Sequence, residues 1–368
     1  MALKKLNEIS FLANLKTSDF EVLRLSAQSQ RQAQILILEI FNVFQRLKFW
    51  SSLILNKLKR FETGSFHKKL LCHTVIFTFL TIILTSCAVT PKKLFVKDIS
   101  RAFEEGTIIS AKTRAPVSFD ALFADLSSAR IIFVGENHSD PVHHEIQLKV
   151  IKELYKTNPD LAVGMEMFDY TYQGVLDQWS EGNLGQKEFL EKTHWYANWR
   201  YDFALYKDIL DFIKEKKIRL VGLNIPPYIQ SRIRVGGIKN LLIKDKKCLP
   251  DKIDTSNTAH RNYVESAYKL HHPQIRKNFE YFYEAQCVWE EIMAQSISRN
   301  IKNDKMVILA GEGHIIYKFG VPDRTFSRIK LPFKTILPVR SGSQAELSYA
   351  DYLWVTPQKI LKNQKSKT

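Results

Sequence analysis

The chain is poor in cysteine: its 368 residues include only Cys72, Cys87, Cys248 and Cys287. No two of them form a C-x-x-C pair, the spacing of thioredoxin-like redox motifs and of many zinc sites. The sequence does not decide whether Cys248 and Cys287 form a disulfide, because Cys287 lies in an apolar helical pattern where a buried free thiol is ordinary. The sequence also lacks the basic tract that nucleic-acid-binding proteins carry, so we expect no nucleic acid among its partners.

An apolar run of membrane-spanning length is missing near the start of the chain as well. The stretch from Leu70 to Leu84 is too short for a spanning helix, which needs about 20 apolar residues. It follows His67-Lys68-Lys69 and ends in Leu84-Thr85-Ser86-Cys87, a pattern typical of a secretory signal. Leu-x-Ser-Cys resembles a bacterial lipobox, in which the cysteine is lipidated. We therefore expect residues 67–87 to export the protein and anchor it to a bacterial membrane, the outer membrane, through Cys87. An uncleaved anchor is the alternative.

Residues 1–66 precede this signal and are expected to be a mis-assigned start or a dispensable extension. The net charge of +16 divides into +7 for residues 1–86 and +9 for the remainder. A charge of +9 favours anionic lipid surfaces or anionic ligands, although a solvated basic surface explains it equally well.

One motif occurs twice in the sequence: a short apolar run followed by Gly-Glu-x-His. Residues 131–134 precede Gly135-Glu136-Asn137-His138, and residues 306–310 precede Gly311-Glu312-Gly313-His314. Short β-branched runs that stop at glycine are typical of buried strands in a parallel sheet. Ligands and catalytic groups collect beyond the carboxyl ends of such strands. The repeat therefore predicts a functional site at one edge of a sheet.

Strand and helix patterns alternate along the chain, which predicts an α/β fold with a mostly parallel sheet and flanking helices. We expect residues 88–117 to be an extended tether, 118–357 the α/β domain and 358–368 a basic tail. A stretch without strand patterns, at about 228–300, predicts a smaller all-helical subdomain. The expected strands are residues 130–134, 161–166, 219–224, 306–310, 335–338 and 352–355.

Polar side chains follow four of these strands. They are Glu136 with His138, Glu166, Asn224, and His314. Carboxylates with imidazoles are the ligand set of a divalent metal and also serve acid–base chemistry. His143 and His144, one turn into the next helix, would add a ligand or a partner for one. We predict a metal or acid–base site at this edge, although a single Glu-x-His is more often only a cap or a turn.

Several short motifs, taken together, resemble the ChaN-like haem-binding lipoproteins over about residues 118–325. The motifs are Gly135-Glu136-Asn137-His138, Gly164-Met165-Glu166-Met167, Tyr283-Glu284-Ala285-Gln286, Trp289-Glu290-Glu291-Ile292-Met293-Ala294, Gly311-Glu312-Gly313-His314 and Gly320-Val321-Pro322. The resemblance implies a parallel sheet with a smaller helical part, haem bound through a tyrosine, a homodimer, and surface anchoring in bacterial iron uptake with a haem receptor or transporter as partner. Glu312 departs from the family pattern, which has a small residue there, and this side chain could face solvent.

A haem site needs an axial ligand, a flat apolar slot and cations for two propionates. Tyr263 is our candidate axial ligand, and His260 and His271 share its helical face. Arg276 is close enough in sequence to meet a propionate. Tyrosine is more often a packing residue, and four others compete for the role of ligand: Tyr281, Tyr283, Tyr196 and Tyr201.

Gln286 is the one polar member of an otherwise apolar stripe formed by Phe279, Phe282, Trp289 and Met293, which predicts a core-facing helix. A buried amide costs stability unless it is paired, so we expect Gln286 to reach a polar group near the sheet edge.

Three functions fit these patterns. The first is an exported lipoprotein that binds haem and assists iron acquisition. The second is a metal-dependent hydrolase, a peptidase or esterase, in which Glu136 and Glu166 would be catalytic beside a divalent metal. The third is a binding module that has lost its chemistry.

Overall fold

The computed structural model describes residues 92–271, 278–302 and 305–358, all within the second of two units of the chain, Thr90–Thr368. The expected signal with Cys87 and the propionate candidate Arg276 lie outside the described residues. Within them, no helix is long and apolar enough to cross a membrane. Cys248 and Cys287 are both free thiols, so they form no bridge with each other.

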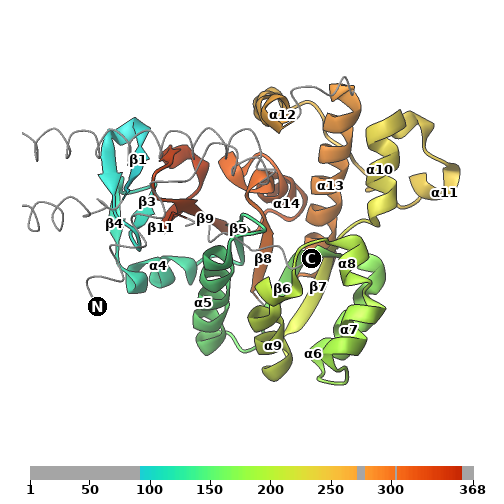
Figure 1. Cartoon of the computed structure of the whole chain (residues 1–368), viewed down its shortest axis with the longest axis horizontal. Coiled ribbons are helices and arrows are strands. Elements are labelled where there is room, and N and C mark those ends of the chain that lie inside the picture. The colour runs from blue at the N-terminus through green and yellow to red at the C-terminus, as the bar shows by residue number, and fades with distance from the viewer. Residues whose placement is uncertain (1–91, 272–277, 303–304, 359–368) are drawn as a thin grey trace, which may run out of the picture. The chain divides into compact units, whose positions relative to one another are not determined.

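An eight-stranded sheet in the order β4-β3-β11-β9-β5-β8-β6-β7 forms the centre of the fold (Figure 1). The strands from β11 to β7 in this order run parallel, whereas β3 and β4 join antiparallel at one edge. The parallel strands are β5 (Ile131–Glu136), β6 (Ala162–Asp169), β7 (Arg219–Asn224), β8 (Met306–Gly311), β9 (Phe333–Arg340) and β11 (Tyr352–Thr356). The predicted α/β fold with a mostly parallel sheet is confirmed.

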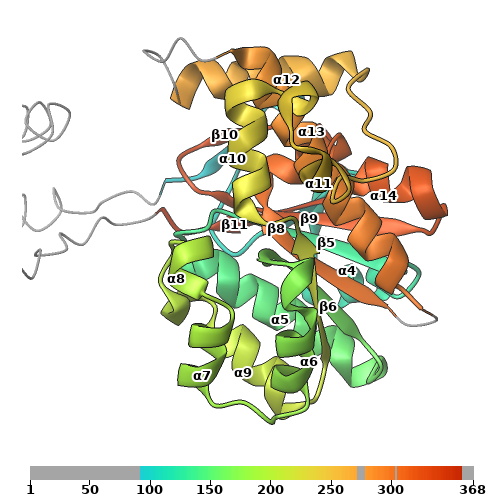
Figure 2. The ribbon, with the colours of Figure 1, turned by 90° about the vertical axis from the view of Figure 1, so that its right-hand side faces the viewer.

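Helices cover one face of the sheet with a large apolar core. Ile132 and Val134 of β5 point into this core, while Ile131 and Phe133 point to the opposite face, as the alternation of a strand requires. The helices on this face are α4 (Phe119–Leu126), α5 (Pro141–Thr157), α6 (Gln173–Ser180), α7 (Gln186–Lys192), α8 (Trp195–Asn198) and α9 (Lys207–Glu215). Figure 2 shows α5 to α9 on one side of the sheet and α10 to α14 on the other.

The second face is covered by α13 (Phe279–Asn300) and α14 (Val321–Ile329). Met293 and Ile297 of α13 pack directly on the strands, so the second half of this helix belongs to the sheet layer. Three further helices lie on this side of the molecule, and the first and third of them pack on α13 through two small apolar clusters (Figure 2). They are α10 (Pro227–Gly236), α11 (Ile243–Lys246) and α12 (Thr258–His271).

The segment expected to be a tether contains short strands, which differs from the sequence interpretation. β1 (Leu94–Val96) and β2 (Arg101–Phe103) form a small sheet with β10 (Gln344–Ala345). β3 (Ile108–Ser110) and β4 (Ala115–Val117) extend the main sheet beside β11. Strands of three residues are too short to show a period of two, and the strands that join them to the rest of the fold, β10 and β11, lie far away in sequence.

The loop after β5 leads into α5 as the sequence predicts. The side chain of Asp140 accepts a hydrogen bond from the Val142 N–H (3.1 Å), and Pro141 occupies the first helical turn. This cap fixes where α5 begins, and so it places His143 and His144 directly behind the end of β5.

Candidate functional site

The carboxyl ends of β5, β8, β6 and β7 lie next to one another in the sheet, and each contributes to one cluster. Glu136 ends β5, Glu166 lies in the last half of β6, and Asn224 ends β7. β8 ends at Gly311, and a short 3-10 helix, η6 (Glu312–His314), carries His314. The structure therefore brings together the strand-end residues that the sequence predicts for this edge.

Glu136 is a buried hydrogen-bond acceptor with partners from several elements. His138 Nδ1 lies 2.8 Å from Oε1, to which the Tyr206 hydroxyl donates at 2.6 Å. Oε2 accepts from Gln147 Nε2 at 2.7 Å and lies 3.3 Å from His144 Nδ1. Burial alone would raise the pKa of Glu136, but the hydrogen bonds from His138 and His144 outweigh it and hold this pKa well below its ordinary value. The carboxylate is therefore charged and fully engaged.

Glu166 lies beside the second motif. Its Oε2 accepts a hydrogen bond from the Gly311 N–H at 2.6 Å, and its Oε1 is 3.5 Å from His314 Nε2. A Cβ on Gly311 would come within 2.8 Å of His138 Cε1, so glycine is needed for the His138 ring to lie against β8. The first histidine thus packs on the glycine of the second motif, and the two copies interlock.

His314 is buried between two carboxylates. Its Nδ1 lies 3.2 Å from Glu290 Oε1 of α13, on the side opposite Glu166, and the Gln286 amide approaches the same nitrogen at 3.0 Å. Burial lowers the pKa of His314, but the charges of Glu166 and Glu290 outweigh burial and raise it to about 10. At neutral pH, His314 is therefore an imidazolium that bridges two buried carboxylates.

Gln286 confirms the prediction that its amide reaches a polar group near the sheet edge, since its Nε2 donates to Glu290 Oε1 at 2.8 Å. The apolar stripe on the same helix is less uniform than expected. Met293 is buried, whereas Phe279, Phe282 and Trp289 are only partly buried, because the fully covered face of α13 also carries the charged Glu290.

Three groups at this site were not predicted from the sequence. Gln147 lies three residues after His144 in α5, Tyr206 precedes α9, and Glu290 lies in the middle of α13. A carboxylate within an apolar helical stretch was the available signal for Glu290. Tyr206 carried no signal of its own.

His143, Asn224 and Glu312 stay at the margin of the cluster. His143 Nδ1 accepts from the Asn137 N–H at 2.9 Å and so stabilises the loop after β5; burial lowers its pKa to about 4. Asn224 donates to the backbone carbonyl of Glu166 at 3.0 Å. The Glu312 side chain is exposed, in keeping with its departure from the family pattern.

The residues expected to bind haem lie in different environments. His260 is buried, with Nε2 3.2 Å from Glu290 Oε2 and Nδ1 3.3 Å from the Tyr283 hydroxyl, so it belongs to the buried network. Tyr263 is half-buried, and its ring lies 5.7 Å from that of Tyr317. His271 is the last residue of α12.

Comparison with known proteins places the chain in a family. The family described as "Haem-binding uptake, Tiki superfamily, ChaN" matches residues 122–325, which is more than half of the chain. The chain belongs to this family. No curated protein matches it.

The solved structure of a ChaN protein shows the fold of this ChaN-family chain at low sequence identity. ChaN of Campylobacter jejuni, solved with cofacially bound haem, is 20% identical with a TM-score of 0.56, over 67% of this chain and 95% of its own. An erythromycin esterase mutant in its open conformation is 11% identical, with a TM-score of 0.37, over 64% of this chain and 77% of its own.

The ChaN-family chain shows no group of three or more His, Cys, Asp or Glu side chains arranged to hold a metal ion within the residues that the structure describes. The sheet-edge cluster instead pairs each carboxylate with an imidazole or with backbone and side-chain donors. It consists of two groups of paired side chains, Glu136 with His138 and Glu166 with His314 and Glu290, which meet at Gly311.

Proposed function

We propose that this protein binds haem at α12 and, as an exported lipoprotein anchored through Cys87, assists iron acquisition. The observation that carries the proposal is the surroundings of Tyr263, taken with membership of the haem-binding uptake family. The Tyr263 hydroxyl has no hydrogen-bond partner among the described residues, although its side chain is half-buried. A phenol oxygen that the protein leaves unpaired is suited to an external ligand.

The surface around Tyr263 suits a flat apolar ligand. Gly313 lies opposite the phenol: a Cβ there would be 3.8 Å from the Tyr263 oxygen, so the glycine leaves space in front of it. Along the same face of α12, Ala267 is half-buried and Leu270 is 80% exposed. An exposed leucine in line with a tyrosine provides an apolar surface beside a ligating group.

Tyr263 is a neutral phenol at neutral pH. Burial, together with the charges of Glu312 and Glu290, raises the pKa of the phenol above its ordinary value. Ferric haem, when bound, supplies a Lewis acid that favours the phenolate. Without such a ligand Tyr263 stays a neutral phenol, and ligation by the iron has to overcome its raised pKa.

A haemin titration of the purified full-length chain tests this proposal. We expect a Soret shift that saturates at a defined stoichiometry and shows the spectrum of tyrosinate-ligated ferric haem. Tyr263→Phe should lose that spectrum, whereas Tyr268→Phe on the same helix serves as the matched control and should keep it. A full wild-type spectrum in Tyr263→Phe would remove this ligand and leave the four competing tyrosines.

The remaining parts of the proposal concern assembly and partners. We propose a homodimer that forms or tightens with haemin, and a haem receptor or transporter as the partner that delivers or accepts the ligand. Sedimentation with and without haemin measures the first. Transfer of haem between the loaded protein and candidate membrane receptors measures the second.

A metal-dependent hydrolase is the alternative, with Glu136 and Glu166 as catalytic carboxylates. The buried Glu166 Oε1, which has no hydrogen-bond partner among the described residues, is the observation in its favour. Family membership favours haem. Metal content of the untreated protein separates the two: stoichiometric divalent metal without a Soret shift would support the hydrolase.

A further inference from the structure

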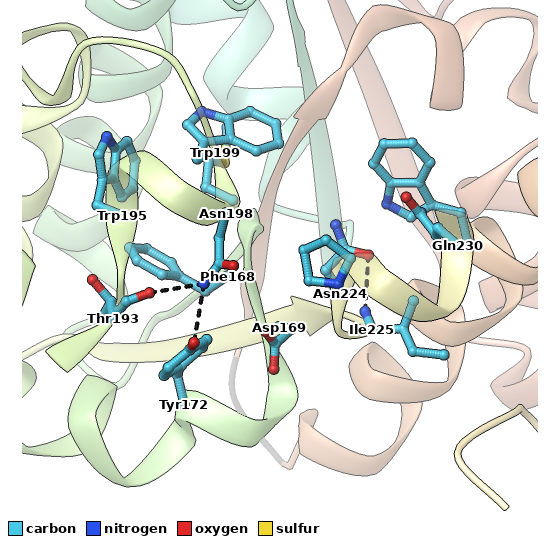
Figure 3. A pocket seen from close by; sticks show the side chains of 13 residues that line it. Phe168, Asp169, Tyr172, Thr193, Trp195, Asn198, Trp199, Asn224, Ile225 and Gln230 are labelled. Atoms are coloured by element: carbon cyan, nitrogen blue, oxygen red, sulfur yellow. Dashed lines mark hydrogen bonds between the residues drawn. The ribbon is translucent and has the colours of Figure 1, made fainter. Parts of the chain in front are cut away.

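A small pocket lies beyond the carboxyl ends of β6 and β7, and no residue of α12 lines it (Figure 3). Asp169 ends β6, Asn224 ends β7, and α8, α10 and α13 close the sides through Trp195, Gln230 and Trp289. Its volume of about 80 Å³ holds several water molecules or a group of a few heavy atoms. Open α/β sheets bind ligands in this position, so the pocket is placed where a ligand is expected.

An irregularity in the pairing of β6 with β7 shapes the backbone beside this pocket. The pairing of β6 with β7 shifts between Met165 and Asp169, because Met165 pairs with Gly222 and Asp169 already pairs with Asn224. The extra residues of β6 form a bulge, a device that re-aims side chains beside functional sites. Gly222 allows it, since a Cβ there would lie 2.7 Å from the Asp169 carbonyl oxygen.

Two buried hydrogen-bond donors on the α10 and α13 side have no partner within the described structure. They are the Gln230 amide Nε2 and the Trp289 indole Nε1. Gln230 is only 8% exposed, so water outside the pocket does not satisfy its amide. An unpaired buried donor costs about 1–3 kcal/mol, and a ligand atom that accepts from it removes this cost.

A carboxylate stands on the other side of the pocket. Asp169 is 6% exposed, and its Oδ1 accepts from the Thr171 N–H at 2.9 Å and from the Thr171 hydroxyl. Its second oxygen, Oδ2, has no hydrogen bond to any residue that the structure describes. Burial raises the pKa of Asp169 above its ordinary value, as expected for a carboxylate without a cation beside it.

Aromatic side chains line the pocket between these polar groups, and ring contacts and hydrogen bonds hold them in place. The Trp195 ring lies 5.4 Å from that of Phe168. Asn198 donates to the Tyr172 hydroxyl and to the Thr193 carbonyl, each at 3.0 Å (Figure 3). A fixed aromatic wall favours a small planar group.

Charge and hydrogen bonding select the kind of group. An anion would meet the two donors but would lie against the Asp169 carboxylate; a cation would meet Asp169 but leave the Gln230 and Trp289 donors unpaired. A neutral group with both an acceptor oxygen and an N–H satisfies both sides. We propose that this pocket binds a small neutral ligand through a carboxamide group, with the carbonyl oxygen toward Gln230 and Trp289 and the N–H toward Asp169.

The pocket adjoins the sheet-edge cluster through its tryptophans. The Trp289 ring lies 4.8 Å from the His314 ring, and Trp199, another lining residue, lies 4.7 Å from His138. A ligand that shifts either indole therefore changes the magnetic surroundings of these imidazoles. The proposal is independent of haem binding, since it uses no residue of α12.

Three probes of the same shape test the proposal on the purified full-length chain: acetamide, acetate and acetamidinium. They differ in charge and in donors, and binding is followed by ligand-observed NMR and by the ring signals of His138 and His314. We expect acetamide to bind most tightly and to shift both histidine signals. Equal binding of the three probes, or no saturable binding of acetamide to folded protein, would overturn the proposal.

Two variants and one control assign the contacts. Gln230→Leu should weaken acetamide binding about three- to tenfold through loss of one hydrogen bond. Asp169→Asn keeps the acceptor for Thr171 but removes the charge, so it should turn the preference toward acetate. Gln178→Leu makes the same chemical change at an exposed position of α6 and should change nothing. Wild-type acetamide affinity in a folded Gln230→Leu variant, or an unchanged preference in Asp169→Asn, counts against the assigned contacts.

Discussion

Replacing Glu290 with glutamine tests whether a buried carboxylate keeps His314 charged. The carboxylate lies 3.2 Å from His314 Nδ1, from His260 Nε2 and from Arg324 Nε. Glutamine preserves the shape but removes the charge. Removing one partner of a buried ion pair costs about 3–5 kcal/mol. We expect the lower end of that range, because Arg324 keeps Glu291 at 2.6 Å as a second partner.

The change of folding stability with pH tests the same charge on His314, and its direction can be predicted. The pKa of His314 rises from 6.5 to about 10 on folding, because Glu166 and Glu290 outweigh the effect of burial, which alone would lower it. A group whose pKa is higher in the folded state contributes stability that is fully present below the unfolded pKa and is lost as the pH rises through the folded value. The wild-type protein should therefore lose stability between about pH 6.5 and pH 10. The variant, which has already lost part of this contribution at pH 7, should lose less.

Urea unfolding at several pH values between 7 and 10 measures the free energies, and NMR titration of the imidazole signals follows His314 itself. Glu312→Gln is the matched control, since this exposed carboxylate stands two residues before His314. A Glu290→Gln loss below about 1 kcal/mol at pH 7, the size of an ordinary hydrogen bond, would refute the reasoning. So would an unchanged dependence of stability on pH.

Three further changes test other contacts. Tyr206→Phe removes the hydroxyl that donates to Glu136 at 2.6 Å, and urea unfolding should show a loss of about 1–3 kcal/mol; a loss near zero would mean that water replaces the hydroxyl. Gly222→Ala places a Cβ 2.7 Å from the Asp169 carbonyl oxygen and should cost about 1–3 kcal/mol in the same assay, whereas Gly174→Ala, with nothing within 4 Å of its Cβ, should cost nothing. Cys87→Ala should move the protein from the membrane to the soluble fraction and abolish its labelling by fatty acid; unchanged fractionation would contradict the lipobox.

The parallel strands could be predicted from the sequence because their signal is local. Residues 219–224 were expected as a strand and form β7 without any shift of boundary, and residues 306–310 were expected where β8 runs to Gly311. Each is a continuous apolar run, buried on both faces, that ends at glycine or at a polar residue. β1 to β4 gave no such signal, since each has only three residues and β3 is stabilised by pairing with β11.

Some residues of the candidate site could likewise be predicted from the sequence, and others could not. Glu136, Glu166 and His314 could be found because each follows or ends a strand, and the carboxyl ends of parallel strands meet at one edge. Glu290 could not be placed there from its sequence position, because it reaches His314 only through the packing of α13 on the second face of the sheet. Tyr206 likewise reaches Glu136 from the loop before α9, across a sequence separation of 70 residues. Partners that come from helices depend on tertiary packing, so the sequence positions of Glu290 and Tyr206 do not show which strand end they meet.

The two copies of Gly-Glu-x-His are therefore unequal because neighbouring strands assign them different positions. β5 pairs with β8 so that Glu136 lies opposite Gly311, and this register sets the first carboxylate inside the sheet edge and the second, Glu312, one residue beyond it. The first motif thus contributes its glutamate as a buried acceptor, and the second contributes its glycine and histidine. Gly311 both admits the His138 ring and donates its N–H to Glu166, while His314 links Glu166 to Glu290. The two copies of the motif form one asymmetric network of hydrogen bonds and ion pairs, because the strands that carry them are adjacent and in register.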